Sequence, residues 1–183
     1  MRKAIISAIV LLSLAAMAEN KYEGRVFQAG GKWTFHISHD KLTGAEYGLF
    51  VLEADQNVTD GISSGKPEFV VMCGGSAKNP KWINSKLISP VVLGLPQTRS
   101  PFSGSPQQLV NLRTDDKIHG HFWNIADDYR TMFVDKGATR EFLHSSEARV
   151  QFRDADGHDQ VAVFTTAGLD RKRAAIACGE IMK

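Results

Sequence analysis

Short runs of alternating apolar and polar residues, separated by turn-forming residues, recur along this 183-residue chain. In residues 32–38, for example, Trp33, Phe35 and Ile37 fall on one face of an extended segment and polar side chains fall on the other. This period of two is typical of a strand with one buried face. The pattern predicts a mainly β fold, either an antiparallel sandwich or two packed β halves, with a short C-terminal helix.

Turn signals indicate how these strands connect. Asp115-Asp116 lies between two apolar runs and predicts an antiparallel hairpin. Asp156-Gly157 predicts a type I′ turn, and counting outward from it pairs Phe152 with Val161 and Val150 with Val163. The remaining predicted strands are residues 47–54, 68–73 and 82–88.

Residues 90–106 contain four prolines among Gly and Ser, which excludes a helix or a central strand and predicts a long loop between two halves. Residues 124–142 are predicted to be mixed turn and irregular structure, and residues 143–148 are predicted to form a short helix. Asp170 is a suitable N-cap for a C-terminal helix that contains Ala174 and Cys178.

The first 18 residues have the organisation of a secretory signal peptide. Arg2 and Lys3 precede an apolar stretch over residues 4–16, and an A-x-A motif follows. The apolar stretch is shorter than the roughly 20 residues of a membrane-spanning helix. We therefore expect a single soluble domain over residues 19–183, located in the bacterial periplasm or secreted, with no membrane insertion after cleavage.

Charge argues against two classes of partner. Without Arg2 and Lys3, 20 basic and 20 acidic side chains remain, so the predicted mature chain is close to neutral. Proteins that bind nucleic acid or anionic membranes usually gather a basic excess on one face. We expect no nucleic-acid partner.

The chain has two cysteines, Cys73 and Cys178. An even number of cysteines in an exported protein favours a disulfide over free thiols. Such a bond would join the middle of the chain to its C-terminal end.

His119 and His121 are candidate metal ligands because residues at i and i+2 of a strand point to the same side. Gly120 between them would allow a ligand or another backbone to approach closely. The alternative is that both histidines lie on the exposed face of a hairpin strand without a metal. A catalytic zinc site needs a third ligand, and spacing does not identify one among the remaining histidines, which are His36, His39, His144 and His158.

Arg113, together with the two histidines and the neighbouring Trp123, could form a recognition surface, since Arg and Trp are common anchors of binding interfaces. In the alternative interpretation, Trp123 belongs to the core and Arg113 is solvated or paired. We identify no catalytic residue, because motifs of serine hydrolases, zinc proteases and phosphate-binding loops are missing from the sequence. The acidic pairs 115/116, 127/128 and 154/156 are explained by turns.

An ordered series of landmarks resembles the VasI-type (TagO-type) exported proteins associated with bacterial type VI secretion. The landmarks follow the leader and cover most of the mature chain: Trp33, the D-x-x-T-G turn at 40–44, Cys73, residues 112–115, Trp123, Asp127, Phe133, residues 142–148, Phe164, Gly168-Leu169 and Cys178. The resemblance implies a periplasmic accessory protein with a β-rich fold, a disulfide at these cysteines and no established enzymatic activity. Two features depart from the pattern: Met72, where Arg is usual, and the long 90–106 loop.

The leading functional hypothesis is a non-enzymatic exported binding or accessory protein with a periplasmic or envelope protein as partner and no cofactor. One alternative is a metal-binding protein or metal-dependent enzyme that uses His119 and His121. Another is a periplasmic inhibitor or immunity protein, which no particular residue supports.

Overall fold

The computed structural model describes residues 25–39, 46–76, 79–172 and 174. These form a large antiparallel sheet, a small two-stranded sheet and a helix. In chain order the elements are β1 (Arg25–Gln28), β2 (Thr34–His39), β3 (Glu46–Glu53), β4 (Val58–Thr59), β5 (Ser64–Gly65), β6 (Glu68–Ser76), β7 (Asn79–Ile88), β8 (Thr98–Arg99), β9 (Pro106–Thr114), β10 (Lys117–Ile125), β11 (Thr131–Val134), α1 (Lys136–His144), β12 (Glu147–Arg153) and β13 (Asp159–Thr165).

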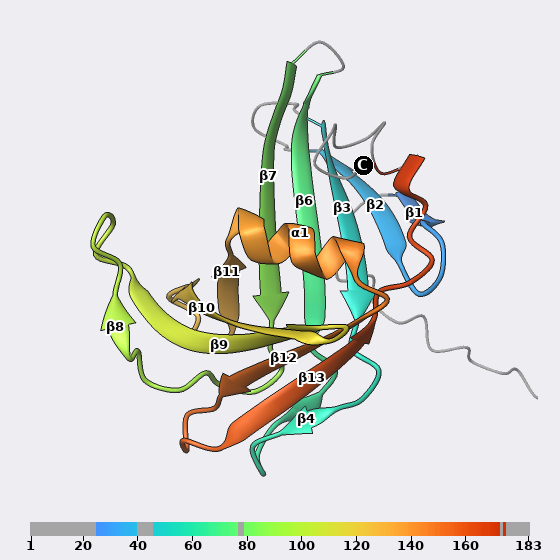
Figure 1. Cartoon of the computed structure of the whole chain (residues 1–183). Coiled ribbons are helices and arrows are strands. Elements are labelled where there is room, and N and C mark those ends of the chain that lie inside the picture. The colour runs from blue at the N-terminus through green and yellow to red at the C-terminus, as the bar shows by residue number, and fades with distance from the viewer. Residues whose placement is uncertain (1–24, 40–45, 77–78, 173, 175–183) are drawn as a thin grey trace, which may run out of the picture.

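The large sheet has the strand order β1-β2-β3-β6-β7-β11-β10-β9-β12-β13, with β8 paired to β9. Strands β2, β3, β6 and β7 stand side by side, whereas β9, β12 and β13 curve across one end of them (Figure 1). The sheet therefore bends into two halves that face a common core, and the predicted mainly β, antiparallel class is confirmed. Within the described residues, no helix has both the length and the apolar character needed to cross a membrane.

The two ends of the sheet path are connected by hydrogen bonds. The indole Nε1 of Trp33 donates to the carbonyl oxygen of Thr166 at 2.9 Å, and the backbone N–H of Asp170 donates to the carbonyl oxygen of Ala29 at 2.7 Å. The turn between β1 and β2 thus lies against the segment that follows β13. These bonds satisfy polar groups that would be costly to leave unpaired in a buried position.

A cluster of aromatic rings fills the space between the halves. Phe142 of α1 stacks on Phe69 of β6, with centroids 3.6 Å apart and planes at 7°. The ring of Phe142 also makes edge-to-face contacts. Its centroid lies 6.4 Å from that of Trp33, with the planes at 88°, and 5.2 Å from that of Phe164 of β13, with the planes at 66°. All four side chains are fully buried. Helix α1 is therefore held in place by contacts with both halves.

The position of the helix corrects the sequence analysis. Helix α1 ends at His144, so the predicted helix at 143–148 is wrong, and residues from Glu147 onward belong to β12. The irregular structure predicted for residues 124–142 is also wrong where β11 and α1 form. Asp135 begins the helix, because its side chain accepts a hydrogen bond from the N–H of Ala138 at 2.9 Å. Gly137 in the first turn obscured the helical pattern, because glycine has a low helix propensity. Burial of Phe142 in the core compensates for this cost.

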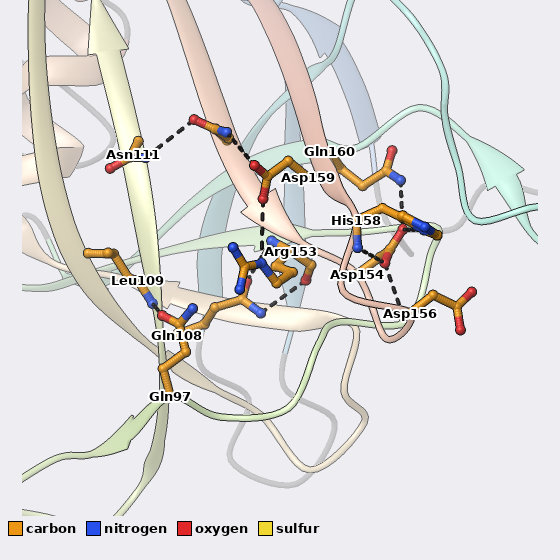
Figure 2. A network of polar contacts seen from close by, with 11 residues as sticks. Gln97, Gln108, Leu109, Asn111, Arg153, Asp154, Asp156, His158, Asp159 and Gln160 are labelled. Atoms are coloured by element: carbon orange, nitrogen blue, oxygen red, sulfur yellow. Dashed lines mark hydrogen bonds and ion pairs between the residues drawn. The ribbon is translucent and has the colours of Figure 1, made fainter.

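The register of the β12–β13 hairpin also differs from the prediction. Phe152 pairs with Gln160 and not with Val161, because the loop is five residues long and not two. Asp154, which is fully buried, organises this loop by accepting hydrogen bonds from the N–H of His158 at 2.8 Å and from Gln160 Nε2 at 2.7 Å (Figure 2). The Asp-Gly turn signal was outweighed by the side-chain bonds of a residue two positions earlier.

Other predictions hold. The Asp115-Asp116 hairpin forms with Thr114 opposite Lys117, and residues 90–106 are mostly loop, interrupted by β8. The predicted C-terminal helix begins as expected, since the N–H of Ala174 donates to the carbonyl oxygen of Asp170 at 2.9 Å, while its remainder lies outside the described residues.

Cys73 on β6 is 2% exposed within the main core cluster, and the described part of the chain contains no free cysteine. Cys178 lies outside the described residues. The Cys73–Cys178 disulfide therefore stays a prediction.

The close approach of the Gly30 backbone to Gly168 provides a test of the contact between the β1–β2 turn and the segment that follows β13. Gly30 has φ of +93°, and a Cβ atom there would overlap the carbonyl oxygen of Gly168. We expect Gly30→Ala to lower the free energy of unfolding by more than about 2 kcal/mol, from left-handed strain and overpacking together. Gly61, with φ of +85° and nothing within 4 Å of such a Cβ, is the matched control, and Gly61→Ala should cost only the conformational part. Urea denaturation of both variants measures this, and equal losses would contradict the role assigned to the close approach.

Candidate metal centre

Strand β10 carries three of the predicted site residues on one face. His119, His121 and Trp123 alternate along the strand and lie opposite Leu112, Val110 and Gln108 of β9, respectively. Those three β9 residues are buried, and directly opposed residues share a face of the sheet. The two histidines therefore lie on the same side of the sheet as these buried residues, toward α1, where His119 is exposed and His121 is partly buried.

Asp135 connects this face of β10 to the start of α1. Its Oδ2 accepts a hydrogen bond from Trp123 Nε1 at 3.3 Å and lies 3.0 Å from His121 Nδ1. Its Oδ1 caps the helix through the N–H of Ala138. Trp123 is fully buried, so the core interpretation of this residue is confirmed.

Glu141 approaches from the second turn of α1. Its Oε2 lies 2.7 Å from His119 Nδ1, and both side chains are partly exposed. One ligand atom each from His119, His121 and Glu141 lies within 4.8 Å of the other two. The structure thus brings the predicted histidine pair together with a carboxylate into one cluster of possible metal ligands.

The imidazole of His121 has one polar atom without a partner. Its Nε2 is buried and forms no hydrogen bond with any residue that the structure describes, whereas its Nδ1 contacts Asp135. A neutral imidazole that donates from Nδ1 to a carboxylate keeps a lone pair on Nε2. This is the carboxylate–histidine arrangement that orients metal-binding histidines in many proteins.

Arg113 does not join this cluster. It pairs in register with Ile118 of β10 and Arg149 of β12, which places it on the opposite face of the sheet from the histidines. Its Nε donates to the carbonyl oxygen of Asp115 at 3.3 Å. The predicted recognition strip containing Arg113, His119 and His121 is therefore wrong, because alternate strand residues point to opposite sides.

Gly120 is not required by the site either. A Cβ atom at this position would lie 3.5 Å from Leu109 Cδ1 and 3.8 Å from Asn111 Oδ1, which are ordinary contacts. These contacts lie on the face away from the histidines.

The other histidines do not supply the third ligand. His36 is buried on β2, where desolvation lowers its pKa while the charge of Glu68 acts to raise it. His158 lies 3.8 Å from Asp154 in the β12–β13 loop, and His144 Nδ1 contacts the carbonyl oxygen of Arg140 at 2.8 Å. The side chain of His39 lies outside the described residues.

The acidic pairs act in turns, as predicted. Asp115 accepts hydrogen bonds from the hydroxyl and the N–H of Ser146, and these bonds lower its pKa. Burial acts to raise the pKa of Asp128, but hydrogen bonds from the N–H groups of Arg130 and Thr131 and from the Thr131 hydroxyl lower it overall.

A pocket of about 490 Å³ adjoins the cluster. His119 and Glu141 belong to its wall, which is completed by the β9–β10 turn and the C-terminal half of α1. The lining residues are Thr114, Asp115, Asp116, Lys117, His119, Arg140, Glu141, His144 and Ser145.

Sequence reasoning missed Glu141 and Asp135. Both lie in the stretch that was predicted to be turn and irregular structure, and neither has a spacing to the histidines that indicates contact. Recognition of Asp135 as an N-cap would have located α1, but the contacts of Glu141 and Asp135 with the histidines of β10 depend on the sheet topology.

No protein-family model and no curated protein matches the chain. Among solved structures, the crystal structure of invasion associated protein B from Bartonella henselae is similar over 84% of this chain and 95% of that chain, with a TM-score of 0.51 and 10% sequence identity. At this identity the similarity shows a shared fold alone.

Proposed function

We propose that this chain is an exported accessory protein that binds a divalent transition-metal ion, Zn²⁺ in first place, through His119, His121 and Glu141. The observation that carries the proposal is the convergence of these three donor groups within 4.8 Å. Two imidazoles and one carboxylate form a ligand set that zinc proteins use when a further position is left for water or another ligand.

The donor types favour a transition metal over calcium or magnesium. Imidazole nitrogen suits Zn²⁺, Cu²⁺ and Ni²⁺, whereas Ca²⁺ and Mg²⁺ prefer oxygen ligands. In His119 and Glu141 the same atoms that now contact each other at 2.7 Å would serve as ligands. A metal would replace this one contact and require a short rearrangement of two partly exposed side chains.

Asp135 supports the proposal from outside the ligand set. It contacts Nδ1 of His121, which leaves the lone pair of the buried Nε2 available as a ligand, and it is itself fixed by Trp123 and by the helix N-terminus. Such outer partners orient the ligand and increase its basicity.

Export is supported by the signal-peptide organisation of the first 18 residues and by the resemblance to VasI-type proteins. A role beside a type VI secretion system, with an envelope protein as partner, belongs to the same proposal.

We expect the wild-type protein to bind one equivalent of Zn²⁺. His119→Ala, His121→Ala and Glu141→Gln should each weaken binding by more than about 100-fold, because loss of a direct ligand should exceed the roughly 10- to 100-fold cost of losing an outer partner. Isothermal titration calorimetry with ZnCl₂ measures this. His158→Ala, which changes an exposed histidine outside the cluster, is the matched control and should bind normally. Unchanged affinity in the three ligand variants would refute the site.

Asp135→Ser separates the helix cap from the contact with His121. Serine is a good N-cap, so the start of the helix should be retained, while the loss of the hydrogen bond from the buried Trp123 indole should lower the free energy of unfolding by about 1 to 3 kcal/mol. The variant loses the carboxylate that orients His121, so Zn²⁺ affinity should fall about 10- to 100-fold. Thermal unfolding and calorimetry on the same sample measure the two effects, and a folded variant with wild-type affinity would rule out the positioning role of Asp135.

Intact-mass spectrometry of the protein recovered from the periplasm or culture medium tests export and the disulfide together. We expect a chain that begins at Glu19 and that gains the mass of two hydrogens on reduction, as a Cys73–Cys178 bond requires. Recovery of the full-length chain from the cytoplasm alone would contradict export.

A further inference from the structure

The pocket beside the histidines shares two residues with the proposed metal site. His119 and Glu141 line the pocket, and both belong to the ligand cluster. A metal held by them would therefore form part of the pocket wall. The volume of about 490 Å³ is in the range of small-molecule sites.

Two cationic side chains in the pocket lack an ionic partner. Lys117 follows the β9–β10 turn and Arg140 lies on α1, and neither forms an ion pair with any described residue. By contrast, the carboxylate of Asp115 in the same wall already accepts hydrogen bonds from the N–H and the hydroxyl of Ser146. The pocket thus presents positive groups that are free to contact a ligand.

A bound metal would reverse the net charge of the pocket. Three acidic side chains, Asp115, Asp116 and Glu141, and two basic ones line it, so the pocket alone carries a small net negative charge when its histidines are neutral. A divalent cation would make the sum positive. An anion should therefore bind after the metal and depend on it.

We propose that this pocket binds a small oxyanion, a carboxylate or a phosphate, one oxygen of which occupies the coordination position that three protein ligands leave open. This inference rests on the proposed metal site. Arg140 and Lys117 would hold the remaining oxygens, because guanidinium and ammonium groups form strong charge-assisted hydrogen bonds with such groups.

Cobalt(II) is a suitable probe, because its visible absorption changes when a ligand enters its coordination sphere. We titrate the cobalt-loaded protein separately with sodium acetate and with inorganic phosphate, and measure bound cobalt by equilibrium dialysis in the same samples. We expect a saturable spectral change with at least one anion while the cobalt stays bound. The anion that produces it identifies the carboxylate or phosphate class.

The variant Arg140→Gln combined with Lys117→Gln should weaken anion binding at least about tenfold without changing cobalt affinity. Arg113→Gln is the matched control, since Arg113 lies on the opposite face of the same sheet, and should behave as wild type. A cobalt spectrum that neither anion alters, or equal anion affinity in both variants, overturns the oxyanion inference and leaves the metal site standing. Failure to bind cobalt overturns both.

Discussion

The position of Phe142 determines the rest of this architecture. Its ring stacks on Phe69 from one half of the sheet and meets Phe164 from the other, so one side chain on α1 joins the two halves. Aromatic contacts of this kind stabilise beyond the area that they bury. Glu141 directly precedes Phe142 in α1, so the core packing that orients Phe142 also positions Glu141 for its contact with His119 of β10.

Asp135 makes the second connection between core and site. Its carboxylate caps the N-terminus of α1 and accepts a hydrogen bond from the indole of the buried Trp123. The same carboxylate contacts His121. The helix start and the orientation of the imidazole therefore cannot change independently. Such coupling is the kind of support that holds a binding site in a fixed geometry, since the side chains around it have few alternative rotamers.

The sequence predicts the longer strands because period-two patterns and turn residues act locally, but it misses the short strands β1, β8 and β11. It also predicts that His119 and His121 share a face, which follows from strand geometry alone. It fails where contacts between distant segments decide the outcome. Spacing could not show that Glu141 of α1 would reach His119 of β10. Nor could it show that the hydrogen bonds of Asp154 would shift the hairpin register that the Asp-Gly signal predicted. Arg113 was assigned to the wrong face because sequence proximity to the histidines was taken for spatial proximity.

A metal at this cluster would also act on the fold. His119 and Glu141 are 22 residues apart and belong to different elements, so an ion between them would connect β10 to α1. A ligand that binds only the folded chain raises the free energy of unfolding in proportion to the logarithm of its concentration. The predicted disulfide would act elsewhere, between β6 and the C-terminal segment. The metal would therefore stabilise the contact between α1 and β10, which in the described residues depends on partly exposed side chains and on Asp135.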